Sequence, residues 1–441
     1  MHFSKEECLK FVNENDVRFI RLQFTDIYGS AKNIAITGKQ LASAFENGVM
    51  FDGSAVPGFT GIEASDMFLF PDPTTFSIMP WRPQQGKVAR IICDVKNPDG
   101  SQFEGDSRYI LKRTLKKAQD LGYTFDVGPE CEFFMFFNDD NGMPTTKTHD
   151  TAGYCDLAPI DLGENTRREI CFVLEEMGYE IETSHHESAA GQHEIDFRYA
   201  DALTAADNIV TFKMVVKIIA QRNGLHATFM PKPLPHVNGS GMHINMSLSK
   251  DGHNLFSADN KVDLSETAKF FTAGLLTHIK GITAFANPLV NSYKRLKSGY
   301  EAPVHIAWSH MNRSPLLRVP APRGEGTRIE LRSPDPSCNP YLTLALLLEA
   351  GMDGLNKRLS LMEPVNVNIY ELTAEQEEKL QLDRLPSNLL FALEEMKKDP
   401  LIRATLGDHT FNKYLKAKTL EWEAYDSTIH AWELEKYLKP Y

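Results

Sequence analysis

Short apolar stretches separated by glycine- and proline-rich loops make up the first hundred residues. The stretches at 17–25 and 88–95 have the composition of β-strands, and the loop FDGSAVPGFTG at 51–61 is typical of the connections between them. A turn-rich segment, KNPDGSQFEGD at 96–106, resembles a domain boundary. The first part of the chain is therefore predicted to be a small β-rich domain.

Beyond residue 106 the apolar pattern becomes helical and alternates with strands. Apolar residues follow i, i+3, i+4, i+7 spacing in 170–177 and cover one face of 110–121. Helices are predicted with N-caps at Ser107, Asn165 and Thr204 and with ends at Gly122, Gly178 and Gly224. More helices are predicted from about residue 340 onward, including an aliphatic one at 341–355. The pattern predicts an α+β protein with a larger second domain.

One predicted strand, VGPECEFFMF at 127–136, carries two glutamates in its middle. Side chains alternate faces along a strand, so Glu130 and Glu132 project from the same side. A solvated strand face is the usual explanation for such a pair, but these glutamates have apolar neighbours on both faces. Like charges so close need a positive partner.

Other polar residues occupy comparable positions on later segments. SHHESAAGQHEIDF places Glu187 and Glu194 across a glycine-containing turn, NGSGMHINMS contains His243, and TRIELRSPD contains Glu330. Each segment alone can be explained without a functional site, for example by a hydrogen-bonded histidine or a cross-strand ion pair. Taken together, five glutamates and one histidine favour Mg²⁺ or Mn²⁺ and suit two ions. Spacing alone does not establish that these strands converge.

Composition narrows the class of protein. The chain has 441 residues and a formal net charge of −12, which argues against a nucleic-acid partner. No apolar run approaches the roughly 18 residues of a membrane span, and the start, MHFSKEECLK, does not resemble a signal peptide. The six cysteines include no C-x-x-C pair, which argues against a structural zinc site or a disulfide framework. A cytoplasmic enzyme is the expectation.

Arginines cluster between residues 295 and 332. Six of them in a glycine- and proline-rich region suggest a substrate with several negative charges, although a basic surface for subunit contact is the alternative. The chain has no P-loop, no dinucleotide fingerprint after a strand and no serine-hydrolase elbow. The residues by themselves therefore indicate a two-metal enzyme acting on phosphate and a carboxylate, and they leave the reaction open.

Several stretches, in order, match a known family. They are FDGSA (51–55), ASDM (64–67), VGPECEFF (127–134), HHESAAGQHE (185–194), VNGSGMH (237–243), NSYKRLKSGYEAPV (291–304), NRSPLLRVP (312–320) and RIELRSPDP (328–336). Over essentially its whole length the chain resembles the type I glutamine synthetases of bacteria and archaea, in their alpha-like subdivision. Any one stretch alone would be weak evidence for this family, but all of them in this order form a specific signature.

The resemblance implies an architecture and an assembly. It implies an N-terminal β-grasp domain over 1–103 and a catalytic domain over 104–441, built from a curved antiparallel sheet with helices. It also implies a homododecamer of two hexameric rings with active sites between subunits. The reaction implied is the ATP-dependent ligation of ammonia to L-glutamate through γ-glutamyl phosphate, with two or more Mg²⁺ or Mn²⁺ ions per subunit.

The resemblance also implies roles for individual residues. Two metal sites would be formed by Glu132, Glu187 and Glu194, and by Glu130, His243 and Glu330. Glutamate would be bound by Asn238, Gly239, Arg295, Glu301 and Arg332. ATP and its phosphates would be bound by Glu182, Asn245, Ser247, Arg313, Arg318 and Arg328. Ammonium would be bound by Asp52 of the adjacent subunit, Tyr154 and Glu187. The expected catalytic residues are Asp52, Glu301 and Arg313.

Some positions depart from the family pattern. Ala55 stands where a serine is common, and Gly61 stands where an inhibitory-type arginine is expected, so glutamine feedback of that form is not expected. Tyr370 lacks the context of a modified tyrosine, so adenylylation is not expected. Two alternatives remain: a ligase of the same fold that glutamylates a larger amine such as a polyamine, and a catalytically silent homologue. The sequence leaves open whether nitrogen-regulatory proteins dock.

Overall fold

The N-terminal part of the chain is a mixed sheet with two helices packed on it. The computed structural model describes residues 3–82, 85–258, 260 and 263–441. Strand order is β2-β1-β6-β4-β3, with β5 beside β6, and β1 runs parallel to β6. The elements are α1 (Lys5–Glu14), β1 (Val17–Thr25), β2 (Ala31–Thr37), α2 (Leu41–Asn47), β3 (Val49–Asp52), β4 (Asp66–Pro71), β5 (Ser77–Ile78) and β6 (Lys87–Lys96). Both predicted strands of this region, 17–25 and 88–95, are confirmed.

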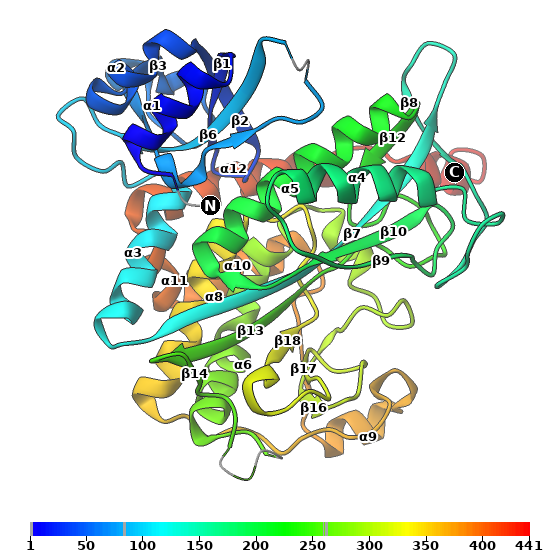
Figure 1. Cartoon of the computed structure of the whole chain (residues 1–441). Coiled ribbons are helices and arrows are strands. Elements are labelled where there is room, and N and C mark those ends of the chain that lie inside the picture. The colour runs from blue at the N-terminus through cyan, green and yellow to red at the C-terminus, as the bar shows by residue number, and fades with distance from the viewer. Residues whose placement is uncertain (1–2, 83–84, 259, 261–262) are drawn as a thin grey trace.

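A second, larger sheet forms the framework of the rest of the chain. Its main path is β16-β17-β18-β13-β7-β10-β9, and its pairings are antiparallel except that between β16 and β17. Its strands are β7 (Thr124–Asn138), β8 (Pro144–Thr148), β9 (Ile181–His186), β10 (Gln192–Phe197), β11 (Ala200–Asp201), β12 (Leu225–Thr228), β13 (Met242–Lys250), β14 (His253–Asn254), β16 (Trp308–His310), β17 (Leu317–Val319) and β18 (Ile329–Leu331). β15 (His305–Ile306) pairs separately with β19 (Asp383–Arg384). The long β7 crosses the middle of this sheet (Figure 1).

Helices surround this second sheet. Helices α4 and α5 lie against β7, β9 and β10, whereas α6 packs against both α8 and α10 (Figure 1). Their bounds are α3 (Ser107–Asp120), α4 (Glu164–Glu176), α5 (Ala202–Arg222), α6 (Glu266–Ala286), α7 (Ser292–Arg295), α8 (Pro340–Lys357), α9 (Ala374–Lys379), α10 (Leu389–Lys398), α11 (Pro400–Leu406), α12 (Asp408–Asp426) and α13 (Ala431–Tyr437). The prediction of an α+β fold with a β-rich first part is confirmed.

Helix ends agree with the sequence better than helix starts. Gly122, Gly178 and Gly224 follow α3, α4 and α5 with φ of 82°, 95° and 77°, the left-handed conformation in which glycine ends a helix without strain. The predicted N-caps are wrong. The caps are Asp106, Gly163 and Asp201. Asp106 and Asp201 cap their helices by accepting hydrogen bonds from backbone N–H groups of the first turn, whereas Gly163 makes no side-chain cap.

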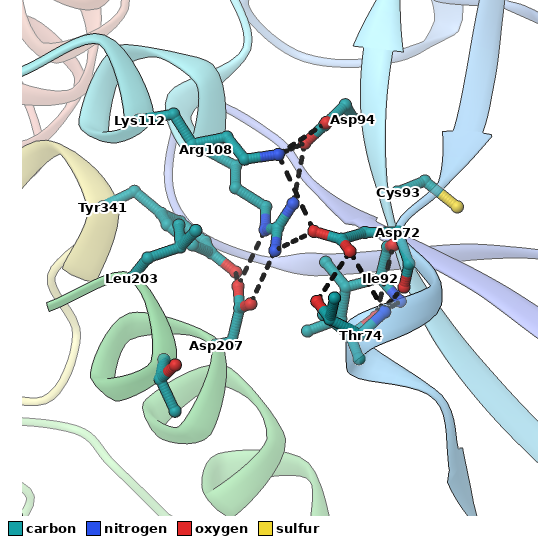
Figure 2. Close-up of polar contacts among 12 residues, drawn as sticks. Asp72, Thr74, Ile92, Cys93, Asp94, Arg108, Lys112, Leu203, Asp207 and Tyr341 are labelled. Atoms are coloured by element: carbon teal, nitrogen blue, oxygen red, sulfur yellow. Dashed lines mark hydrogen bonds and ion pairs between the residues drawn. The ribbon is translucent and has the colours of Figure 1, made fainter. Parts of the chain in front are cut away.

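Two hydrophobic cores lie on either side of a buried ionic cluster. One core is formed by the N-terminal sheet with α1 and α2, and the other fills the space between the larger sheet and its helices. Between them Arg108 of α3 donates to both oxygens of Asp207 on α5 at 3.0 and 2.9 Å, to Asp94 at 2.7 Å and to Asp72 at 2.9 Å (Figure 2). Burial alone would lower the pKa of Arg108, but Asp207 and Asp94 hold it well above its ordinary value.

Two predictions about the chain's chemistry can be compared with the structure. In the described residues no helix is long and apolar enough to cross a bilayer. The six cysteines are all free thiols, and four of them, Cys8, Cys93, Cys131 and Cys338, are buried. The expectation that the cysteines form no disulfide framework is confirmed.

Candidate active site

Polar side chains form rows across the large sheet because neighbouring strands are in matching register. His243 of β13 lies opposite Glu130 of β7, and Asp196 of β10 lies opposite Glu130 on the other side. Thr183 of β9 lies opposite Asp196 and extends this row. Directly opposite residues of an antiparallel pair point to the same face. We call Thr183, Asp196, Glu130 and His243 the Glu130 row.

A second row lies one step along the same strands. Glu132 of β7 is opposite Glu194 of β10, which in turn is opposite His185 of β9. Glu187, in the turn after β9, joins it, with His185 Nε2 2.9 Å from its Oε1. Possible ligand atoms of His185, Glu187 and Glu194 all lie within 4.8 Å of one another. We call Glu132, Glu187 and Glu194 the first carboxylate group.

The first carboxylate group brings several carboxyl groups together without enough positive charge to keep all of them ionised. Burial, followed by the charge of Glu187, raises the pKa of Glu132 to about 8. Burial also raises the pKa of Glu194 well above its ordinary value. Glu132 Oε2 accepts hydrogen bonds from Gln192 Nε2 at 2.7 Å and from Gly241 N at 2.9 Å, which fixes its orientation. A divalent cation would compensate this group, and three carboxylates suit Mg²⁺ or Mn²⁺.

The second carboxylate group is Glu130, His243 and Glu330, whose ligand atoms also lie within 4.8 Å of one another. Burial would raise the pKa of Glu130, but hydrogen bonds with His243 at 3.2 Å and from Asn245 at 2.8 Å lower it to about 2. The pKa of Glu330 is also lowered, because the charges of His243 and Arg332 outweigh its burial. Both carboxylates are therefore ionised at neutral pH. Two carboxylates and one imidazole also fit Mg²⁺ or Mn²⁺.

Two cavities meet at the Glu130 row. The smaller, about 630 Å³, is lined by Glu182, Asn245, Ser247 and Arg328, among others. The larger, about 1110 Å³, is lined by Tyr154, Glu187, Asn238, Gly239, Arg295, Glu301, Arg313 and Arg332, among others. Glu130, Thr183 and Asp196 line both. The predicted ATP residues and glutamate residues thus separate largely into two neighbouring cavities.

Arg295 is held rigidly at the back of the larger cavity. It is buried, and its guanidinium donates to the carbonyl oxygens of Ser333 at 2.7 Å and Arg332 at 3.1 Å. The backbone at Gly241 approaches it so closely that a Cβ there would lie 2.6 Å from Arg295 Nη2. Glycine is therefore required at this position so that the guanidinium can reach the cavity.

Glu301 lies over the larger cavity in a strained conformation. Its φ is 54°, in the left-handed region, and its carboxylate accepts a hydrogen bond from Asn238 Nδ2 at 3.0 Å. Such a conformation in a non-glycine residue costs energy and is concentrated at functional sites. The contact joins the 297–301 loop to Asn238, another residue predicted to bind glutamate.

The opposite face of β9 and β10 carries a buried network of histidines. Asp150 accepts from Gly191 N at 2.8 Å and lies 3.2 Å from His186 Nε2. Arg167 lies 2.9 Å from His193 Nδ1, and a guanidinium can only donate, so the proton of a neutral His193 is on Nε2. That protonation disfavours metal binding by His193. The network instead supports the turn between β9 and β10 that carries Glu187, through His186 Nδ1 at the Glu187 carbonyl and Asp150 at Gly191 N.

Comparisons with known proteins identify this arrangement. Residues 104–437 match the model of the glutamine synthetase catalytic domain, and residues 16–98 match that of its β-grasp domain. The chain is 59% identical over 440 residues to a glutamine synthetase of Clostridium saccharobutylicum and 55% identical over 441 residues to one of Staphylococcus aureus; each match covers 100% of this chain and 99% of the relative. The chain belongs to the glutamine synthetase family.

Solved structures agree with this membership. A structure of GmaS with ADP superposes with a TM-score of 0.89 at 32% identity, covering 98% of this chain and 99% of the other. A cryo-EM structure of Plasmodium falciparum glutamine synthetase superposes with a TM-score of 0.87 at 26% identity, covering 99% of each chain. The comparisons confirm three predictions made from sequence motifs: the family, its β-grasp and catalytic domains, and the enzyme class of glutamate–ammonia ligases. Membership in the glutamine synthetase family implies use of ATP and a divalent metal ion.

Three predicted residues, Asp52, Arg318 and Glu330, are not among those that line either cavity. Asp52, at the end of β3, is exposed, and its Oδ1 accepts from Ser54 Oγ at 2.6 Å and Ser54 N at 2.9 Å, which lowers its pKa. Arg318 instead donates to Glu330 at 2.5 Å from behind the second carboxylate group. In this member of the glutamine synthetase family Arg318 therefore contacts a candidate metal ligand.

Three residues of the site were not predicted. His185 contacts Glu187, Gln192 orients Glu132, and Asp196 stands beside Glu130. Glu194 and Asp196 have the same i, i+2 spacing as Glu130 and Glu132, and this spacing was the signal that could have identified Asp196. His185 stands two residues before Glu187, so the same spacing applied to it, whereas the contact of Gln192 with Glu132 depends on the register between strands.

Proposed function

We propose that the chain joins ammonia to the γ-carboxyl group of L-glutamate, with ATP converted to ADP and phosphate. The observation that carries this proposal is the meeting of two cavities at the Glu130 row. Glu130 and His243 of the second carboxylate group lie in that row, and the first carboxylate group lies in the next row of the same sheet. A nucleotide in one cavity would direct its terminal phosphate toward a carboxylate in the other. This geometry suits phosphoryl transfer followed by attack of ammonia.

Two Mg²⁺ or Mn²⁺ ions are proposed for each subunit, one held by the first carboxylate group and one by the second. When bound, these cations neutralise the charge that develops on the transferring phosphate. The chain's own residues orient the ligands. Glu132 accepts hydrogen bonds from Gln192 and Gly241 N, and Glu130 accepts one from Asn245. Glu330 accepts hydrogen bonds from Arg318 and Arg332.

The substrates are proposed to lie in separate cavities. Glutamate binds in the larger cavity to Asn238, Gly239, Arg295 and Arg332. ATP binds in the smaller cavity to Glu182, Asn245, Ser247 and Arg328, and Arg318 supports Glu330 by a hydrogen bond. The γ-carboxylate oxygen of glutamate attacks the terminal phosphorus, the bond from that phosphorus to ADP breaks, and γ-glutamyl phosphate forms. Arg313, which lines the larger cavity, is positioned to stabilise the transferring phosphate.

Ammonia attack completes the proposed reaction. Asp52 of a neighbouring subunit accepts a proton from ammonium, which Tyr154 and Glu187 help to hold. The nitrogen attacks the acyl carbon and phosphate leaves as glutamine forms. Glu301 closes over the acyl phosphate, and exclusion of water there prevents its hydrolysis.

The exposed position of Asp52 supports an assembly in which another subunit completes the site. We infer a dodecamer of two hexameric rings, in the cytoplasm where ATP and glutamate are supplied. Exposed apolar side chains at Trp432, Leu434 and Leu438 of the C-terminal segment are consistent with contacts between subunits. Sedimentation of the purified protein tests the assembly, and a monomer would contradict it.

Phosphate release from ATP in the presence of glutamate and Mg²⁺ tests the reaction. Ammonium should stimulate release strongly, with one glutamine formed per phosphate, and putrescine should not. Stimulation by putrescine alone would instead assign the chain to ligases that glutamylate larger amines. A folded, assembled protein that is silent with every amine would contradict an enzymatic role, as would a Glu132→Ala variant as active as the parent.

A further inference from the structure

Asp196 is a carboxylate at the junction of the two cavities that has no role in the proposed reaction so far. It lies on β10 between Glu130 on β7 and Thr183 on β9, and two residues beyond Glu194. We propose that Asp196 belongs to the metal centre and that its free Oδ1 binds, directly or through a coordinated water, the cation held by Glu130. The inference rests on the proposed use of divalent cations.

The two oxygens of Asp196 differ in their surroundings. Oδ2 accepts a hydrogen bond from the hydroxyl of Thr183, which fixes the direction of the carboxylate. Oδ1 is inaccessible to solvent and has no hydrogen-bond partner among the residues that the structure describes. A buried carboxylate oxygen without a partner is costly, so a ligand that binds it is expected.

The charges around Asp196 favour a cation as that ligand. Glu130 is directly opposite and Glu194 is on the same face of the same strand. The arginines of this region are turned elsewhere: Arg318 and Arg332 donate to Glu330 at 2.5 and 2.6 Å. A neutral hydrogen-bond donor would satisfy Oδ1 but would leave the repulsion between these carboxylates in place.

The position of Asp196 between the cavities gives a second argument. Asp196 lines both cavities, so the phosphate transferred between them must pass close to its carboxylate. Two anions at short range repel strongly in a partly dehydrated site. A cation between Asp196, Glu130 and the phosphate removes this repulsion. Asp196 then contributes to the same charge balance as the six predicted ligands.

Binding of Mn²⁺ to the assembled, substrate-free protein tests the inference without reference to activity. Free Mn²⁺ is measured by electron paramagnetic resonance as the metal is titrated into wild type and Asp196→Asn. The substitution keeps the shape of the side chain and its contact with Thr183 but removes the charge. We expect one class of site to weaken by about 10–100-fold while the other class is unchanged.

Asp126→Asn is the matched control. Asp126 lines the smaller cavity as well, but its Oδ2 already accepts from Ser249 Oγ at 2.8 Å, so its Mn²⁺ isotherm should match the wild type. Asp196→Ser provides a smaller second variant should the amide disturb folding, and it should show the same selective loss. An Asp196→Asn isotherm equal to the wild type, or equal weakening of both classes, would overturn the inference. A wild-type protein that binds no Mn²⁺ would refute the proposed metal centre itself.

Discussion

At the scale of single residues, the site is organised by differences in charge compensation. Glu330 is paired with two arginines, and Glu130 forms hydrogen bonds with His243 and Asn245. Glu132, in contrast, is buried beside Glu187, and the hydrogen-bond donor Gln192 that contacts it is neutral. The two carboxylate groups contain the same number of ligands but do not have the same affinity for protons. A cation at the first group must replace protons, and a cation at the second group need not.

This difference predicts a pH dependence of metal binding. The pKa of Glu132 is raised to about 8 by burial and Glu187, so below that pH the free carboxyl group carries a proton that a cation must displace. The pKa of Glu194 is raised as well, so affinity at the first carboxylate group should fall as pH decreases, by about tenfold per pH unit for each proton that the cation displaces. Mn²⁺ titrations between about pH 6.5 and about pH 9 measure this change in affinity.

The second carboxylate group provides an internal control for that titration. The pKa values of Glu130 and Glu330 are lowered, so both are already ionised over this range, and the pKa of His243 is lowered too. Affinity at this site should change little. Equal pH dependence at both sites, or tighter binding at the first site as pH decreases, would contradict the assignment.

At the scale of elements, α3 links the N-terminal sheet to the catalytic sheet through Arg108. Three carboxylates from a loop, a strand and a helix converge on this one guanidinium: Asp72, Asp94 and Asp207 (Figure 2). Tyr341 of α8 also donates to Asp207 at 2.7 Å. Arg108 and Asp207 are buried, whereas Asp72 and Asp94 are partly exposed and also lie 3.7 and 2.7 Å from Lys112 Nζ. The buried Arg108–Asp207 pair therefore depends most on its mutual charge.

Removal of the Arg108 charge should therefore destabilise the fold strongly. Arg108→Met leaves three carboxylates near one another without a full counter-charge, which should cost about 3–5 kcal/mol. The midpoint of urea unfolding, followed by circular dichroism at fixed protein concentration, measures the loss. Arg198→Met, which removes an exposed pair with Glu180, is the control and should leave the midpoint unchanged. Similar midpoints for the two variants would show that the cluster contributes little.

At the scale of the whole molecule, one chain does not bring all of the predicted site together. Most of the predicted metal ligands and of the glutamate and ATP residues line the two cavities, whereas Asp52 lies exposed on the N-terminal sheet. If Asp52 acts in a neighbouring subunit, each active site draws on two chains. Two defects on different chains could then compensate each other.

Mixed oligomers of Asp52→Ala and Glu132→Ala subunits should regain activity. Each variant alone should be inactive, because every site lacks either the proton acceptor or a metal ligand. Random assembly of equal amounts gives roughly one site in four with both residues intact, hence roughly a quarter of wild-type glutamine formation. Co-expression with different affinity tags and purification through both provides the sample. Mixed oligomers without activity would place both residues in the same chain's site.

The sequence by itself determined the family, the α+β class and the local spacing of the chemistry. Period-2 alternation placed Glu130 and Glu132 on one face of a strand, and left-handed glycines ended the helices where expected. Both properties depend on a few neighbouring residues along the backbone. Helix starts were missed because several side chains near each start could cap the first turn, and the ones that do are Asp106 and Asp201.

Only the tertiary structure decided which side chains meet. The register of β10 against β7 brings Asp196 to Glu130, and that of β13 against β7 brings His243 to the same carboxylate. A slip of one residue in either pairing would turn these side chains to the opposite face. The register depends on contacts between segments more than a hundred residues apart for β13 and β7. The division into two carboxylate groups with different charge compensation is for this reason a property of the folded sheet.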